Sequence, residues 1–195
     1  MRSSLSTMSL LAACALAACG PAEPGPEGPP GAEGPAGPMG ASGPAGDPGT
    51  TGQEIYEAYG TGQLVVSAQT TTFVTVPGLS LTVNIPTGAR VRVDTNGGIQ
   101  CSMPGNAYSV VDLALFVDNA SPGQAGMRRV VAANTAVVGQ MIAGWSFGRT
   151  FNLGAGSHTF EVRGISVDPG AAAANVSSGS APQIQGVLTV TVLKQ

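Results

Sequence analysis

Few side chains in this chain could take part in catalysis. His158 is the only histidine, so any reaction that needs an imidazole must use it, with Ser157 or Asp168 as nominal partners. We expect no Gly-x-Ser-x-Gly nucleophile elbow, and nothing else in the sequence supports such a set. We expect His158 to be a strand residue hydrogen-bonded to backbone. The sequence therefore favours a protein that is not an enzyme and that needs no cofactor.

Patterns that bind metals are equally scarce. Cys101 is the only cysteine after residue 19, and with a single histidine it cannot complete a structural zinc site. Asp112 and Asp118 are a weak suggestion of a surface metal site, and no loop has the spacing of a calcium site. We predict no metal, and we expect Cys101, which alternates with its neighbours like a strand residue, to be buried.

An aromatic cluster is the best candidate for a binding surface. Trp145, Phe147 and Phe151 lie close together in the sequence, with Arg149 among them. They form either a platform for a sugar or partner, or packing in the core or at a trimer axis. Trp145 and Phe147 are two residues apart and would face the same side of a strand, which favours packing.

The N-terminus has the features of an export signal. Arg2 precedes an apolar run from Leu5 to Ala18 that is too short to span a membrane, so residues 1–18 are predicted to be a signal peptide. Leu16-Ala17-Ala18-Cys19 resembles the lipobox of bacterial lipoproteins. This resemblance implies that Cys19 is acylated and that residues 19–24 tether the protein to a membrane.

Two alternatives to this anchor remain. Leu11-Ala12-Ala13-Cys14 has the same pattern, although cleavage there would leave a very short signal. Ordinary cleavage after Ala17 would release the protein without lipid. Gly20 is not the aspartate that retains some lipoproteins at the inner membrane, so we expect an exported protein at the outer membrane or cell surface.

Residues 25–54 repeat glycine at every third position, which indicates a collagen-like stalk. Three polyproline-like chains wind around an axis where only glycine fits. A flexible linker is the alternative, but a linker does not keep strict register over ten triplets. The pattern therefore predicts a homotrimer. The glycines are Gly25, Gly28, Gly31, Gly34, Gly37, Gly40, Gly43, Gly46, Gly49 and Gly52.

Such a stalk would be long but weakly held. At about 3.1 Å per residue, thirty residues give a rod of roughly 90 Å. Residues 20–60 carry six acidic side chains and no basic one, so the three chains would repel one another. We expect the C-terminal part of the chain to hold the three strands together.

Composition changes sharply after the stalk. Most of the 15 prolines precede residue 50, whereas Val, Thr and Leu dominate after residue 62. We assign residues 55–62 to a neck and residues 63–195 to a folded head. The head has seven basic and five acidic side chains without a clustered basic surface, which argues against nucleic acid as a partner.

The head is predicted to be all-β. Short stretches of alternating residues, separated by Pro and Gly turns, indicate eight to ten antiparallel strands in a β-sandwich or jelly roll. Thr95-Asn96-Gly97-Gly98 predicts a tight hairpin turn. Residues 168–182, which include an alanine run, are predicted to be a long mobile loop. The expected strands are 64–66, 72–76, 79–85, 89–94, 110–117, 127–133, 137–147, 158–163 and 187–193.

Residues 153–163 contain the run Gly156-Ser157-His158-Thr159-Phe160, and residues 188–193 form a closing Thr/Val strand. A collagen-like stalk followed by such a domain resembles the trimers of the complement C1q and tumour-necrosis-factor superfamily. The resemblance lies in pattern and order, over residues 62–195. It implies a ten-stranded jelly roll, a threefold axis lined by apolar and aromatic side chains, and recognition through loops.

These features predict a lipid-anchored homotrimer at the cell surface, in which a collagen-like stalk presents a β-sandwich head. Its function would be adhesion or a structural surface interaction with an unidentified glycan or protein. A soluble carbohydrate-binding module, or a trimeric module derived from a phage fibre, is the alternative.

Overall fold

The computed structural model describes residues 25, 28, 52–121 and 123–194 of the chain. The chain divides into two units, residues 1–45 and 46–195, and the second contains the head. The predicted signal peptide, Cys19, the tether and the repeat glycines other than Gly25, Gly28 and Gly52 lie outside the described residues. A side chain added at any of these three glycines would meet nothing within 4 Å.

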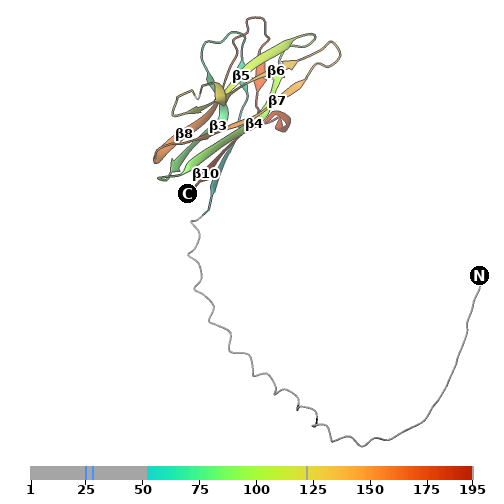
Figure 1. Ribbon diagram of the computed structural model, residues 1–195. Coiled ribbons are helices and arrows are strands. Elements are labelled where there is room, and N and C mark those ends of the chain that lie inside the picture. The colour runs from blue at the N-terminus through green and yellow to red at the C-terminus, as the bar shows by residue number, and fades with distance from the viewer. Residues whose placement is uncertain (1–24, 26–27, 29–51, 122, 195) are drawn as a thin grey trace, which may run out of the picture. The chain divides into compact units, whose positions relative to one another are not determined.

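The head is an all-β sandwich, as predicted, and its strands pair antiparallel (Figure 1). Its ten strands form one six-stranded and one four-stranded sheet, and the described residues contain only two short 3-10 helices besides them. The strands are β1 (Glu54–Tyr59), β2 (Leu64–Val66), β3 (Val74–Ile85), β4 (Arg90–Cys101), β5 (Tyr108–Val117), β6 (Met127–Ala133), β7 (Ile142–Phe151), β8 (Gly156–Ile165), β9 (Ala174–Val176) and β10 (Val187–Leu193). The 3-10 helices are η1 (Gln124–Gly126) and η2 (Pro182–Ile184).

Strand β4 is the centre of the larger sheet. One edge of β4 pairs with β7 over the whole range from Val91 to Gln100. Its other edge pairs first with β10 and then with β9, so β10 and β9 follow one another along it. Strands β1 and β2 continue the sheet beyond β10 and β9. The smaller sheet has the order β3-β8-β5-β6.

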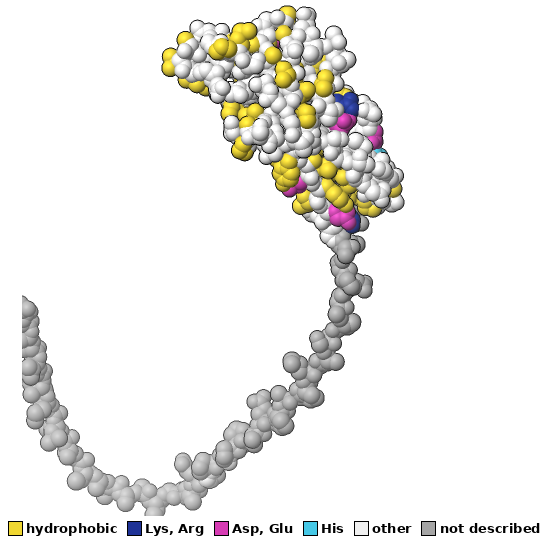
Figure 2. Space-filling model, turned by 180° about the vertical axis from the view of Figure 1, so that it is seen from behind, with side chains coloured by type: hydrophobic (Ala, Val, Ile, Leu, Met, Phe, Trp, Pro, Cys, Tyr) yellow, Lys and Arg dark blue, Asp and Glu magenta, His cyan; other side chains and the backbone are white. Residues whose placement is uncertain are grey.

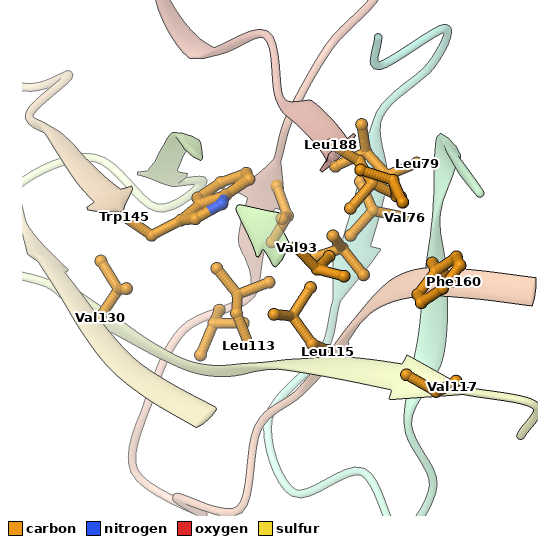
Figure 3. Close-up of a cluster of buried hydrophobic side chains, with 14 of the residues drawn as sticks. Val76, Leu79, Val93, Leu113, Leu115, Val117, Val130, Trp145, Phe160 and Leu188 are labelled. Carbon is orange, nitrogen blue, oxygen red and sulfur yellow. The ribbon is translucent and has the colours of Figure 1, made fainter. Parts of the chain in front are cut away.

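The core lies between the two sheets, and alternation along the strands fills it. Val91 and Val93 of β4 are fully buried, whereas Arg90 and Arg92 are exposed, as the sequence predicts. Figure 3 shows Trp145 of β7 lying across from Leu113 and Val130 of the opposite sheet. Cys101 ends β4 as a buried free thiol, which confirms the expectation of burial.

The hairpin predicted at Thr95-Asn96-Gly97-Gly98 is wrong, because these residues lie inside β4 and pair with β7. The glycines serve close packing instead. A Cβ on Gly97 would lie 2.4 Å from two ring carbons of Trp145, and a Cβ on Gly98 would lie 2.9 Å from Ile184. The two positions without side chains therefore create the space that Trp145 and Ile184 occupy.

Strand β3 runs through Pro77-Gly78, where the sequence predicted a break between two strands. The pairing of β3 with β8 shifts register between Thr75 and Ser80, which marks a β-bulge. Gly78 has a φ of +86°, and a Cβ there would lie 2.3 Å from the carbonyl oxygen of Tyr59. The bulge therefore needs glycine both for its backbone angle and for its close contact with the chain after β1.

Two loop predictions also need correction. Residues 168–182, expected to be a mobile loop, contain β9 and the buried residues Ala171, Ser177 and Ser178. The alanines there are small enough to pack against the sheets. The strand predicted from Val137 instead begins at Ile142 and extends to Phe151. Residues 135–138 form a turn, in which the N–H of Thr135 donates to the carbonyl of Val138 over 2.9 Å.

The head's first strand starts at Glu54, the last residue of the tenth glycine triplet. Strand β1 pairs with β10, and Glu54 forms an ion pair with Lys194. Beyond β1, the N–H of Gly60 donates to Gly186 over 2.8 Å, and that of Thr61 donates to Pro77 over 3.1 Å. Most of the segment assigned to the neck is therefore built into the sandwich.

Apolar side chains are exposed over much of the head. Figure 2 shows hydrophobic side chains across one face, whereas charged side chains lie mainly in the lower half of that view. The exposed apolar residues include Ile55 and Tyr59 of β1, and Val137 is 93% exposed. Among the described residues, no helix has the length and apolar character needed to cross a membrane.

We predict that Gly97→Ala destabilises the head by about 1–3 kcal/mol, because the added methyl group has no room beside Trp145. Gly144→Ala is the matched control. It lies on the neighbouring strand β7, and its Cβ would meet only a carbonyl oxygen at 3.5 Å. Urea unfolding monitored by Trp145 fluorescence measures both. Equal stability of the two variants would contradict the packing role of Gly97.

Candidate functional site

One hollow of the head has a volume of about 360 Å³ and lies at one edge of the sandwich. Its two walls are the turn that follows β5 and the end of β7. Apolar side chains make up most of the lining, and Asp118 and Arg149 are its two charged members. The lining residues are Val117, Asp118, Ala120, Ser121, Arg149, Phe151 and Leu153.

A two-residue turn forms the first wall. Asp118 and Asn119 both have positive φ, 51° and 65°, and Val117 and Ala120 exchange backbone hydrogen bonds of 3.1 and 2.8 Å around them. Two positive-φ residues are typical of a type I′ turn, whose twist matches that of the flanking strands. Asp and Asn tolerate this conformation better than other residues with side chains. The turn directs the Asp118 carboxylate toward β8.

His158 links the two walls of the hollow. Its Nδ1 lies 2.7 Å from Oδ2 of Asp118, and its Nε2 lies 3.1 Å from the carbonyl oxygen of Gly154. An ionised carboxylate and a carbonyl can only accept hydrogen bonds. Both contacts are therefore hydrogen bonds at the same time only when the imidazole is protonated on both nitrogens. The expected backbone partner is confirmed, whereas Asp118 was not predicted.

The electrostatics of this pair agree with its geometry. The hydrogen bond to Asp118 raises the pKa of His158 above its usual value of 6.5. The pKa of Asp118 is lowered, first by the backbone N–H of Thr159, which donates to Oδ1 over 2.9 Å, and then by His158. Each partner thus favours the charged form of the other.

The structure divides the predicted aromatic cluster. Arg149 and Phe151 line the hollow together, with the Arg149 guanidinium 5.3 Å from the centre of the Phe151 ring. Trp145 is buried in the core, where its Nε1–H donates to Thr95 Oγ1 over 3.1 Å. Phe147 packs against the same core. A binding role is therefore open to Arg149 and Phe151, and Trp145 serves packing.

The nominal catalytic partners of His158 are not assembled. Asp168 follows the end of β8, at the opposite end of that strand from His158, and accepts a hydrogen bond from the N–H of Gly170. Asp112 forms a bidentate ion pair with Arg129, so it does not share a site with Asp118. Within the described part of the chain, no three His, Cys, Asp or Glu residues could hold a metal together.

The sequence analysis counted no Gly-x-Ser-x-Gly elbow, yet Ser146 lies in a run with that spacing, from Gly144 to Gly148. In serine hydrolases, this spacing places the serine on a sharp turn between a strand and a helix. Here all five residues lie within β7 and pair with β4. Ser146 is therefore an ordinary strand residue, and Gly148 makes room for the ion pair of Arg92 with Asp94.

A second hollow, of about 200 Å³, lies near the other end of the sandwich. Met103 and Tyr108 are its large side chains, and Asn106 adds a polar group. None of its lining residues is charged. It differs from the first hollow in lacking groups that could orient an ionic ligand.

The first hollow combines an aromatic ring, a guanidinium, a carboxylate and a hydroxyl on apolar walls, which is an arrangement suited to binding. The sequence pointed to Arg149 and Phe151. It did not point to the turn after β5. The pair Asp118-Asn119 between two predicted strands could have indicated that turn, because Asp and Asn favour turns. No protein-family model matches this chain, and a search of curated proteins also found no match.

We predict that His158 titrates above pH 6.5, and that Asp118→Asn lowers this midpoint because the charged partner is lost. As the only histidine, His158 gives an unambiguous imidazole signal for NMR titration. Asp168→Asn is the control and leaves the midpoint unchanged. An equal midpoint in the wild type and in Asp118→Asn would contradict the ion pair.

The same pair makes stability depend on pH in a defined direction. A raised pKa of His158 stabilises the folded state below the unfolded pKa, and this contribution is lost as pH rises through the folded pKa. The lowered pKa of Asp118 contributes above the unfolded pKa of that carboxyl and is lost as pH falls through the folded one. Denaturant unfolding at several pH values measures the free energy of unfolding. In Asp118→Asn, the loss of stability at high pH and the loss at low pH should both be smaller than in the wild type.

Proposed function

We propose that this protein is a lipid-anchored homotrimer at the cell surface, in which a collagen-like stalk carries a jelly-roll head that makes adhesive or structural contacts. The observation that carries the proposal is the unbroken run of ten Gly-X-Y triplets. A chain with this pattern buries its glycines only by associating with two others.

The order of the strands supports the jelly roll and the likeness to the C1q and tumour-necrosis-factor superfamily. With the short strands β2 and β9 set aside, one sheet has the order β1-β10-β4-β7 and the other β3-β8-β5-β6. The chain passes between the two sheets in the sequence expected of an eight-stranded jelly roll built from two Greek keys.

The junction between repeat and head supports coupling of the two. The tenth triplet ends at Glu54, where β1 begins, so the repeat and the first strand are directly adjacent in the sequence. Three chains leaving a triple helix would enter three heads directly. Contacts between the heads would then fix the register of a stalk whose acidic side chains repel one another.

The first prediction from this proposal concerns the stalk. Gly37→Ala should lower the melting temperature of the triple helix, because a methyl group does not fit at the crowded axis. Met39→Ala, at an outward position of the same triplet, is the matched control. Far-UV circular dichroism of the mature chain follows the transition. A stalk that responds equally to both substitutions, or that shows no triple-helical band, would contradict the proposal.

The second prediction concerns the anchor. Cys19→Ala should move the protein from the membrane fraction to the soluble fraction and abolish its labelling by a fatty-acid analogue. Cys14→Ala should leave both unchanged, because Cys14 lies in the removed signal. Release of the wild-type protein without lipid would favour the alternative, a soluble carbohydrate-binding or phage-fibre-derived module.

A further inference from the structure

Two loops at one end of the head expose apolar side chains. The loop after β4 contains Met103, and the loop between β6 and β7 contains Val137, Val138 and Met141, followed by Ile142 at the start of β7. All five are exposed, and Val137, at 93%, is the most exposed large apolar side chain among the described residues. We call these five side chains the apolar tip.

Strand register places the apolar tip at the end of the larger sheet opposite to the start of β1. Glu54 pairs with Val192 of β10, which pairs with Val91 near the start of β4. Ile142 pairs with Gln100 near the end of β4. A strand rises about 3.3 Å per residue, so the stretch from Val91 to Gln100 separates the two ends by about 30 Å.

A buried asparagine holds the two loops together. The side-chain Nδ2 of Asn134 donates to the carbonyl oxygen of Met103 over 2.6 Å and to that of Cys101 over 3.3 Å. Its Oδ1 accepts the N–H of Met141 over 3.0 Å. All hydrogen-bonding groups of this buried amide thus point to loop or strand-end backbone. The apolar tip is therefore ordered before it meets a partner, which lowers the entropy cost of binding.

The backbone of the longer loop is also hydrogen-bonded within the head. From residue 134 to residue 138, each N–H donates to an acceptor in the same two loops. The interior of a bilayer offers no partner for a backbone N–H, so a segment that enters it must satisfy these groups itself. Contact with water or with a protein makes no such demand. The acceptors are the carbonyl of Ala107 for Asn134 (2.7 Å), the carbonyl of Val138 for Thr135 (2.9 Å), the side chain of Asn106 for Ala136 (2.8 Å), and the hydroxyl of Thr135 for Val137 (3.3 Å) and Val138 (2.9 Å).

The sequence around the apolar tip carries no charge. No Asp, Glu, Lys, Arg or His occurs in residues 95–111 or 130–148, which contain both loops. Charged side chains are costly in hydrocarbon, so their absence suits a segment that enters it. Protein interfaces draw much of their binding energy from Trp, Tyr and Arg. None of these occurs in residues 102–107 or 134–142.

We propose that the apolar tip inserts into the hydrocarbon of a lipid surface. A shallow depth of about 5–10 Å, like that of interfacial helices, is sufficient for such side chains. Because neither loop contains a basic residue, the contact needs no anionic lipid. The inference names a partner for the adhesive contacts proposed above and rests on the proposed function only in that respect, since the apolar tip belongs to a single head.

The test uses the mature chain from residue 20, produced without its signal and therefore without acyl chains. Vesicles of phosphatidylcholine alone, and of phosphatidylcholine with phosphatidylglycerol, are the probes in a flotation assay. The chain should float equally with both kinds of vesicle, at low and at high salt. No flotation at millimolar lipid would overturn the proposal. So would flotation with the anionic vesicles alone that is lost at high salt, because charge and not apolar insertion would then explain it.

Substitutions locate the contact in the apolar tip. Val137→Gln combined with Met141→Gln should lower the partition coefficient at least about tenfold, because two apolar side chains no longer leave water. Val74→Gln is the matched control and keeps the wild-type value. Val74 is 48% exposed, close to the 44% of Met141, and lies on edge strand β3, level with Arg128 across the smaller sheet. Equal binding of the double variant and the control would refute the assignment.

Fluorescence separates insertion from adsorption at the headgroups. Val137→Trp places an indole in the apolar tip, and lipids brominated on their acyl chains should quench it. Trp145 is buried in the core, so the wild-type chain supplies the unquenched background. Vesicle binding without quenching in Val137→Trp would contradict insertion.

Failure of this inference is distinguishable from failure of the proposed function. A trimeric, acylated protein that ignores vesicles would overturn the lipid contact alone. A monomer that floats with vesicles would overturn the proposed trimer alone. If no vesicle is bound and light scattering gives a lower mass for the Val137→Gln, Met141→Gln variant than for the wild type, a second copy of the chain covers the apolar tip, and the lipid proposal is wrong.

Discussion

Close packing at glycine positions of β4 is the constraint on which the head depends. Strand β4 pairs with β7, β9 and β10, so a change in its backbone would disturb most of the larger sheet. Gly97 lets the Trp145 ring cross above β4, and Gly98 does the same for Ile184. Thr95 accepts the indole N–H and donates its own hydroxyl to the Val187 carbonyl, so the polar groups brought into the core are satisfied.

The parts of the fold that could be predicted from the sequence are those that depend on neighbouring residues in the chain. Alternation of apolar residues is a local signal, and it correctly indicated an all-β sandwich and most strand positions. Whether a glycine forms a turn or makes room for close packing depends on residues that are distant from it in the sequence. Asn96-Gly97 resembles a hairpin turn until Trp145 is placed beside it, whereas the turn at Asp118-Asn119 has no glycine and was missed. Pro77-Gly78 is likewise compatible with a bulge within one strand.

The candidate site illustrates the same limit. Arg149 and Phe151 were found because aromatic and basic residues cluster in the sequence, and they line the hollow together. Their partners come from a turn about thirty residues earlier and from β8, so no spacing rule could connect them. His158 acquires its raised pKa only where the chain brings Asp118 to it. The proposed function and the proposed lipid contact rest on different parts of the molecule, the repeat and the head.

The central claim is that three chains associate through the repeat and the heads. The most direct measurement is the molar mass of the mature, detergent-solubilised protein by size-exclusion chromatography with multi-angle light scattering, corrected for bound detergent. The account predicts a mass of three chains at all working concentrations. A mass of one chain would contradict it, because one chain cannot bury the glycines of ten triplets at a shared axis.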